Sequence, residues 1–229
     1  MDRISAILVG FLLVLGQRLA DGCTCMPAHP QEHFCRAGFA IKGTILSKKP
    51  LLEPGMNFAT HLIYKVQLDK VFKGEDSGLK GGDVMDIKTA TMDSMCGNTG
   101  LAEGKSYLLT GNAYSDKFYH SACNLATEWQ QVSVFQRKGL RNFYRKSCGE
   151  CEIRQPFGYY YSDTPVAQIC SYNFYHHQSL DGGMEDCEAK YSTCLQKTKG
   201  SCNWLTSPAY DECVLNRDII NGDSGSGFL

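Results

Sequence analysis

The chain has 229 residues, of which 43% are hydrophobic and 21% are charged, and its formal net charge is −1. This composition excludes an intrinsically disordered chain and a collagen- or mucin-like repeat. The near-zero charge gives no indication of nucleic-acid binding, and after residue 22 no apolar run approaches the roughly 18 residues that a membrane-spanning helix needs.

The first 22 residues have the features of a secretory signal peptide. A short charged start precedes an almost unbroken apolar run over residues 4–15. Ala20 and Gly22 are small residues with the spacing that signal peptidase requires, which predicts cleavage after Gly22. Removal of 22 of the 229 residues leaves 207, and these keep all 12 cysteines. Thiols pair in the oxidising secretory compartment, so we expect six disulfides in a secreted, extracellular or matrix protein.

Cysteine spacing and charge divide the mature chain at the same place. Six cysteines are spread over residues 23–148, and six more are crowded into residues 151–213. Residues 23–148 contain 16 Lys and Arg against 11 Asp and Glu, whereas residues 149–229 contain 5 against 11. This coincidence predicts two domains, 23–148 and 149–220, followed by a Gly/Ser-rich tail at 221–229 that we expect to be disordered.

The first part is expected to consist mainly of strands. Apolar and polar residues alternate from Leu62 to Leu68, and shorter runs of this kind or of apolar residues occur elsewhere. The four predicted strands cover residues 39–46, 62–68, 84–89 and 106–110. Because Gly-rich turns separate these strands, they favour a small barrel over βαβ units.

Two helices are predicted from capping residues. Ser133 and Gln136 have the spacing of a capping box ahead of a short helix near the end of the first part. In the second part, Asp181 is expected to cap a helix that runs through Gln196. That helix would place Cys187, Tyr191 and Cys194 on one face.

Three motifs could carry chemistry but favour a structural interpretation. The segment 222–225 resembles the nucleophile segment of trypsin-like proteases, but a terminal tail cannot hold an oxyanion hole and no matching His segment precedes it. His29 and His33 lack a third zinc ligand, so we expect surface histidines. Cys148 and Cys151 form a C-x-x-C, which in a secreted chain indicates two half-cystines with different partners.

A basic cluster occupies ten residues near the end of the first part. We expect these residues to form a solvated helix face, and a site for sulfated glycosaminoglycans is the alternative. The cluster consists of Arg137, Lys138, Arg141, Arg145 and Lys146.

The most informative motif is Cys23-Thr24-Cys25. After cleavage, residue 23 would carry both a free α-amine and a half-cystine, so a disulfide would fix the chain terminus. An α-amine has a pKa near ~8, and together with its own carbonyl oxygen it forms a five-membered chelate. Catalytic zinc in metalloproteases has one position held by water, which such an amine could displace.

These residues open a series of motifs that resembles the tissue inhibitors of metalloproteinases. The segment Cys23-Thr24-Cys25-Met26-Pro27 looks like the mature start of that family. Further matching segments lie at residues 29–31, 34–35, 71–74, 94–97, 107–111, 123–125, 129 and 136–140.

The resemblance implies a mainly β fold with flanking helices, in which a netrin-like, OB-type five-stranded barrel precedes a small disulfide-rich domain. For the first domain it implies the disulfides Cys23–Cys96, Cys25–Cys123 and Cys35–Cys148. For the second it implies Cys151–Cys202 and Cys170–Cys194. The family's small loop between two nearby cysteines is not visible after Cys151, and we pair Cys187 with the extra Cys213 instead.

The resemblance also implies a function. In the family, the amine and carbonyl of the residue matching Cys23 chelate the zinc of the target enzyme, and the side chain matching Thr24 enters its primary specificity pocket. The remaining contacts with the metalloproteinase are expected from Cys25, Met26, Pro27, Ser94, Met95, Cys96 and Gly97.

The expected protein is therefore a monomeric inhibitor and not an enzyme, with no cofactor of its own. It would use the zinc of its target and inhibit by stoichiometric occupancy of the active site. The residues leave open whether the partners are matrix-type or disintegrin-type metalloproteinases. The alternative function is a netrin-like extracellular binding module without inhibitory activity, which would expose no terminal Cys amine.

Overall fold

The structure, a computed structural model, describes residues 23–155, 164–173 and 185–224. We call residues 23–148 the barrel region and residues 149–224 the cystine-rich region. The predicted signal peptide lies outside the described residues. Within them, no helix combines the length and apolar character that crossing a bilayer requires.

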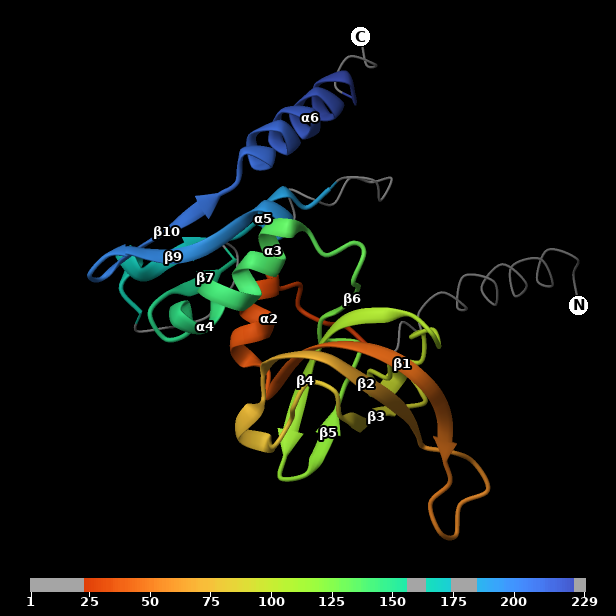
Figure 1. Cartoon of the computed structure of the whole chain (residues 1–229). Helices are drawn as coiled ribbons and strands as arrows, with labels where there is room; N and C mark the ends of the chain where they lie inside the picture. Colours follow the sequence, from red (N-terminus) through yellow and green to blue (C-terminus); the bar gives the residue numbers. More distant parts are fainter. Residues whose placement is uncertain (1–22, 156–163, 174–184, 225–229) are drawn as a thin grey trace, which may run out of the picture.

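A closed five-stranded β-barrel forms the larger part of the molecule, as expected (Figure 1). The sheet order is β1-β2-β3-β5-β4, and β1 also pairs with β4, which closes the barrel. A sixth strand, β6, pairs with β4. The strands are β1 Phe39–Leu51, β2 His61–Lys73, β3 Val84–Ala90, β4 Ser106–Tyr114, β5 Lys117–Tyr119 and β6 Ala126–Glu128.

Period-two alternation fills the barrel with apolar side chains. Tyr64, Val66 and Leu68 of β2 are fully buried, whereas Lys65 between them is exposed. The four predicted strands are confirmed, although β1 and β2 are longer than predicted and continue into an exposed hairpin. The short strands β5 and β6 have three residues each, too few for a recognisable alternation.

Short helices cover one end of the barrel, where a second apolar core forms around Phe34, Leu140 and Tyr144. They are α2 Pro30–Arg36, α3 Val134–Lys138 and α4 Tyr144–Ser147, the last two joined by a π-helical turn, Gly139–Phe143. Both hydrogen bonds of the predicted capping box between Ser133 and Gln136 are present. Gly139 is needed because a Cβ there would lie 2.5 Å from the Tyr144 ring.

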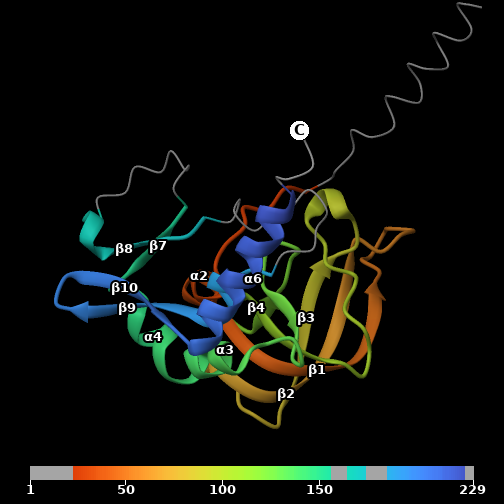
Figure 2. The same cartoon turned by 90° about the horizontal axis from the view of Figure 1, so that it is seen from above.

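The cystine-rich region lies against these helices, on the side away from the β1–β2 hairpin (Figures 1 and 2). Its described residues form two small sheets: the parallel pair β7 Glu152–Arg154 and β8 Ile169–Ser171, and the antiparallel pair β9 Ser192–Thr198 and β10 Ser201–Thr206. They also form two α-helices, α5 Cys187–Tyr191 and α6 Pro208–Ser224. Short 3₁₀ turns occur at Glu75–Ser77, Asp93–Met95 and Val166–Gln168.

Two sequence predictions for this region are wrong in part. Of the helix expected from Asp181 to Gln196, residues 181–184 lie outside the described residues, and among the others only Cys187–Tyr191 is helical. Asp186 caps this helix, α5, by accepting a hydrogen bond from the Ala189 N–H. From Ser192 the chain forms β9, because the main chain of this segment pairs with β10. The Cys194 N–H also donates a hydrogen bond to the Gln31 side chain of α2. Of the tail expected to be disordered at residues 221–229, residues 221–224 are helical as the continuation of α6, and residues 225–229 lie outside the described residues.

Candidate functional site

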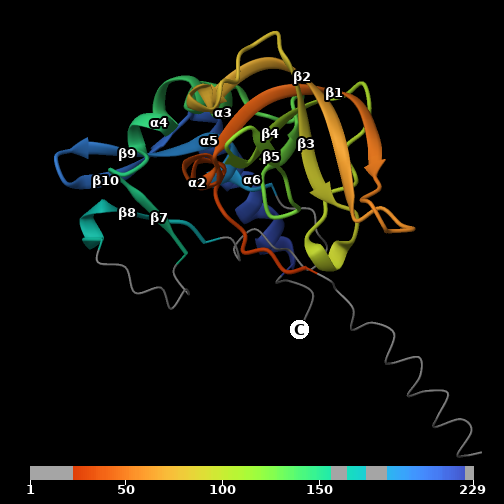
Figure 3. The same ribbon diagram turned by 90° about the horizontal axis from the view of Figure 1, so that it is seen from below.

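The candidate site is the start of the mature chain, which lies beside the 3₁₀ turn Asp93–Met95. We call residues 23–27 together with residues 92–97 the terminal ridge. Two disulfides bind it: Cys23–Cys96, with the Cα atoms 5.2 Å apart, and Cys25–Cys123, with the Cα atoms 5.1 Å apart. Figure 3 shows the red start of the described chain passing beside this yellow-green turn. Residues about 70 positions apart in sequence thus form one surface.

Backbone hydrogen bonds fix the shape of the turn in the terminal ridge. The N–H groups of Met95 and Gly97 both donate to the Met92 carbonyl oxygen, each at 3.1 Å. Cys96 has a left-handed backbone with φ of 53°, and its carbonyl oxygen accepts a 2.8 Å bond from the Ala122 N–H. A Cβ on Gly97 would lie 2.2 Å from the Ala90 carbonyl oxygen, so only glycine fits here.

All nine residues expected to contact a metalloproteinase belong to the terminal ridge. Thr24 and Ser94 are exposed, and the side chains of Met26 and Met95 are 56% and 50% exposed. Gly97 is buried, so its role is to shape the turn. The remaining members, Cys23, Cys25, Pro27 and Cys96, are partly buried.

Three sulfur atoms lie close together beneath the ridge without forming a thiolate ligand set. The Cys23 sulfur is 4.0 Å from that of Cys25 and 3.9 Å from that of Cys123. Each of these sulfur atoms already forms a disulfide bond. Because a metal-binding cysteine must be a thiolate, the cluster is explained by two adjacent disulfides.

His29 connects the ridge to the cystine-rich region, and the prediction of a surface histidine is wrong. It is fully buried as the N-cap of α2, where its Nδ1 accepts a 3.1 Å bond from the Gln31 N–H. The proton of the neutral ring therefore lies on Nε2, which donates to the Glu188 carbonyl oxygen at 3.1 Å. The rings of Tyr172 and Trp204 lie beside it, at centroid distances of 5.4 and 5.1 Å.

Burial also determines the charge state of this histidine. It lowers the pKa of His29 to about 4, although the neighbouring Glu188 and Asp186 favour the charged form. His33, one turn later, is half-buried, and its pKa is also lowered to about 4, mainly by burial and further by Arg36. Both imidazoles are therefore neutral at pH 7.

Gln31 and Gln155 form the other links behind the ridge. The Gln31 amide pairs with the main chain of Cys194 in both directions, donating at 2.8 Å to its carbonyl oxygen and accepting at 2.9 Å from its N–H. The Gln155 amide donates to the Pro27 carbonyl oxygen. Local sequence gives no sign of these contacts, because the partners of Gln31 and Gln155 are 163 and 128 residues away.

The capping residues of α3 contribute to the same junction. The Ser133 hydroxyl donates to the Lys190 carbonyl oxygen, and the Gln136 amide donates to that of Ala189 at 3.0 Å. Both acceptors belong to the last turn of α5, so the N-cap and N3 side chains of α3 satisfy two of its terminal carbonyl groups.

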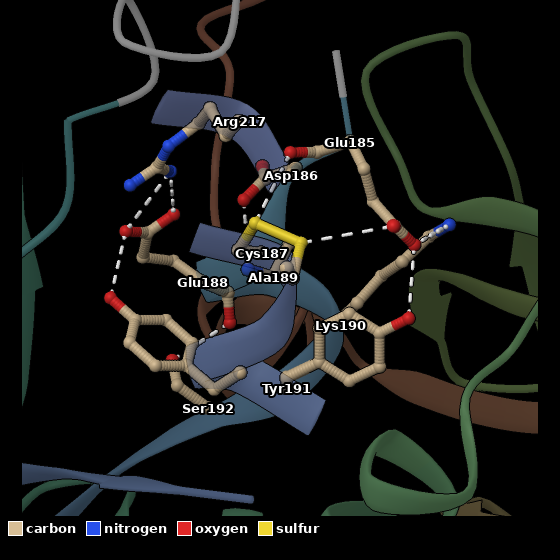
Figure 4. The surroundings of a disulfide bond; sticks show 11 residues. Glu185, Asp186, Cys187, Glu188, Ala189, Lys190, Tyr191, Ser192 and Arg217 are labelled. Carbon is tan, nitrogen blue, oxygen red and sulfur yellow. Dashed lines mark hydrogen bonds and ion pairs between the residues drawn. A yellow bond between two sulfur atoms is a disulfide. The ribbon is translucent and has the colours of Figure 1, made fainter. Parts of the chain in front are cut away.

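A disulfide and a set of charged residues attach α6 to α5 (Figure 4). The Cys187–Cys213 disulfide lies between two acidic side chains. Glu188 of α5 forms a 3.0 Å ion pair with Arg217 of α6. Glu185 forms a 2.7 Å ion pair with Lys190 within the α5 segment itself. The hydrogen bond from Lys190 is the main cause that lowers the pKa of Glu185.

The six disulfides observed are those expected, including the extra pair Cys187–Cys213. They use all 12 cysteines of the chain. Cys148 and Cys151 have different partners, as the interpretation of the C-x-x-C predicted.

The basic cluster of residues 137–146 is only partly a solvated helix face. The Arg137 guanidinium lies 4.6 Å from the centroid of the Trp129 ring and donates to the Trp129 carbonyl oxygen at 2.7 Å. Arg145 donates to the Phe72 carbonyl oxygen and pairs with Glu75, each at 2.7 Å. Arg145 is nevertheless exposed, as are Lys138, Arg141 and Lys146, so only Arg137 departs from the expected solvated face.

The tip of the β1–β2 hairpin is an exposed apolar surface. The sequence indicated that contacts with the target cleft are spread over loops such as residues 51–58, but it could not place this loop. Leu52 and Phe58 are 62% and 61% exposed, and Met56 is 45% exposed. The structure places residues 52–60 at the end of the β1–β2 hairpin.

Comparison with known proteins shows which proteins this chain is similar to. The family model described as "Tissue inhibitor of metalloproteinase" matches residues 21–204. Metalloproteinase inhibitor 3 of Gallus gallus is 32% identical over 215 residues, which cover 91% of this chain and 96% of that protein. Metalloproteinase inhibitor 2 of Rattus norvegicus is 31% identical over 205 residues, which cover 86% and 88%. The family match ends at Trp204, so Cys213 and α6 lie beyond it.

Proposed function

Because the chain belongs to the tissue inhibitor of metalloproteinase family, we propose that it is a secreted inhibitor that occupies the active-site cleft of zinc metalloproteinases in a one-to-one complex. The relatives are named as inhibitors, and we assign no catalytic residue to this chain. The observation that carries the proposal is the terminal ridge, in which two disulfides fix the residues on both sides of the exposed Thr24.

The proposed mechanism uses the main chain of Cys23. After cleavage behind Gly22, the neutral α-amine and the carbonyl oxygen of Cys23 would chelate the zinc of the target enzyme and displace its bound water. The Thr24 side chain would enter the specificity pocket. The metal belongs to the partner, and the chain supplies two ligand atoms and no cofactor of its own.

The geometry of the terminal ridge supports tight binding by this route. Its disulfides and the backbone hydrogen bonds of residues 92–97 leave little conformational entropy to be lost on docking. A chain terminus at the metal also offers no scissile peptide bond there, so the ridge would lie in the cleft like a substrate without being cleaved.

The test is to block the amine without changing the ridge. We expect one Ala inserted ahead of Cys23 in the mature protein to weaken inhibition of a metalloproteinase catalytic domain by at least about 100-fold, since two ligand atoms at the metal are lost. The matched control carries the same Ala after Leu229 and should inhibit like the parent. Circular dichroism and an intact mass with six disulfides would establish that both variants fold.

Two results would contradict parts of the proposal. Undiminished inhibition by the extended form would exclude chelation by the Cys23 amine. Absence of inhibition by a mature protein that begins at Cys23 would favour the alternative, a netrin-like binding module. N-terminal sequencing of the secreted protein must therefore precede the inhibition assay.

Two properties remain predictions: the class of metalloproteinase that is inhibited, and the binding of a sulfated polysaccharide. Inhibition assays with one matrix-type and one disintegrin-type catalytic domain would decide the class. Lys138, Arg141 and Lys146 provide exposed charge for the second, so their replacement by Gln should lower the salt concentration at which the protein elutes from a heparin column.

A further inference from the structure

Three exposed methionines belong to the terminal ridge, whose two segments the Cys23–Cys96 disulfide joins. Met26 follows Cys25, and Met92 and Met95 lie at the 3₁₀ turn just before Cys96. Their exposed fractions are 56%, 44% and 50%. The ridge thus presents three large apolar side chains to solvent, and exposed apolar surface of this kind is typical of an interaction site.

The disulfides leave methionine as the reactive sulfur of the molecule. All 12 cysteines are paired, so no thiol competes for a mild oxidant. Met85, by contrast, lies in the barrel core with 7% of its surface exposed. Because the rate of methionine oxidation follows exposure, the three ridge methionines should react well before Met85.

We propose that Met26, Met92 and Met95 form an oxidation-sensitive modification site through which peroxides switch off inhibition. The inference rests on the proposed function of the terminal ridge and adds its regulation. In each step the O–O bond of hydrogen peroxide breaks and one oxygen forms a bond to the thioether sulfur. The sulfur loses two electrons and becomes a sulfoxide, and the peroxide is reduced to water.

The sulfoxide would weaken docking because it is strongly polar. A thioether can enter an apolar cleft without losing hydrogen bonds. A sulfoxide oxygen would have to give up its hydrogen bonds with water, and an apolar cleft offers no donor to replace them. The hydrogen bonds that fix residues 92–97 prevent the main chain from turning Met92 and Met95 away from the docking surface. The modified groups therefore stay where the enzyme has to bind.

The experiment treats the mature protein with hydrogen peroxide, removes the oxidant, and measures inhibition of a metalloproteinase catalytic domain. Peptide mass mapping should find sulfoxide at Met26, Met92 and Met95 before Met85. The inhibition constant should rise at least about tenfold, as expected for one or more buried polar groups without partners. Methionine sulfoxide reductase should restore it.

Two variants make the assignment specific, and each is compared with itself before and after oxidation. In the triple variant Met26→Leu, Met92→Leu, Met95→Leu, the inhibition constant after oxidation should nearly equal the one before oxidation, whatever inhibition the untreated variant shows. Met56→Leu removes an exposed thioether of the β1–β2 hairpin instead and should remain as sensitive as the parent.

Two outcomes overturn the inference alone: an unchanged inhibition constant after the three methionines are oxidised, or equal sensitivity of the triple variant. If the untreated protein does not inhibit, the proposed function itself fails and the inference with it. The untreated sample therefore separates the two failures.

Discussion

Protonation of His29 would remove the cap of α2, while the hydrogen bond from Nε2 to the Glu188 carbonyl oxygen would remain. A proton on Nδ1 removes the acceptor that caps α2 and places a positive charge in a fully buried site. The α2 helix begins three residues after the terminal ridge, and the His29 side chain that caps it also hydrogen-bonds to Glu188. This one side chain therefore links the ridge to the cystine-rich region.

The pH dependence of stability follows from the lowered pKa. The unfolded chain binds the proton near pH 6.5 and the folded protein only near pH 4, so stability falls as the pH drops through this window. We expect His29 to make the free energy of unfolding about 2 kcal/mol lower at pH 5 than at pH 7. Urea unfolding at both pH values measures this difference.

Substitution separates His29 from His33, which titrates in the same window. Asn at position 29 can still cap a helix but does not titrate, so His29→Asn should remove the His29 part of the pH dependence. His33→Asn is the matched control and should retain that part. An unchanged pH dependence in His29→Asn would show that the histidine does not control acid stability.

At the scale of elements, the 3₁₀ turn of the terminal ridge depends on Gly97. We expect Gly97→Ala to destabilise the protein by about 2 kcal/mol or more, because the new Cβ would meet the Ala90 carbonyl oxygen at 2.2 Å and the turn has to move. The displacement reaches Cys96, so inhibition should weaken as well.

Gly100→Ala is the matched control for this prediction. A Cβ there would lie 3.8 Å from its nearest neighbour, the Asn98 Oδ1 atom, which is an ordinary contact. Thermal unfolding and the inhibition constant should stay near the parent values. Equal effects of the two substitutions would mean that close packing at Gly97 does not shape the ridge.

Element types were predictable where a local pattern decided them. Alternation along β2 and the capping box at Ser133 depend on neighbours in sequence, and both predictions are confirmed. The prediction for residues 192–196 failed because β9 is stabilised by pairing with β10, which overrides any local helical preference. The burial of His29 was equally invisible, since Glu188 lies 159 residues away.

The terminal ridge was predictable for a different reason. Residues 23–27 and 94–97 were identified from a series of family motifs, and a pattern of spacing alone would not have paired Cys23 with Cys96. Gln31 is part of that series, but its paired hydrogen bonds with Cys194 required the folded chain.

At the scale of the whole molecule, Gln31 joins the barrel region to the cystine-rich region. Gln31→Leu would leave the buried N–H and carbonyl of Cys194 without partners, which should cost about 2–5 kcal/mol of unfolding free energy. Hydrogen exchange of the Cys194 amide should accelerate at the same time.

The surface residue Gln67 provides the control for this substitution. Its amide donates to the carbonyl oxygens of Gly82 and Asp83 at an exposed position, so Gln67→Leu should change stability by less than about 1 kcal/mol. If the two variants unfold at the same urea concentration, the pairing of Gln31 with Cys194 does not couple the two regions.

The long sequence separation within this pairing sets an order of events during synthesis. Gln31 leaves the ribosome 163 residues before Cys194, an interval of roughly 10–30 s at ordinary elongation rates. Throughout that time its amide is hydrated and its partner does not yet exist. The segment of the chain that is made first is therefore among the last to reach its final surroundings.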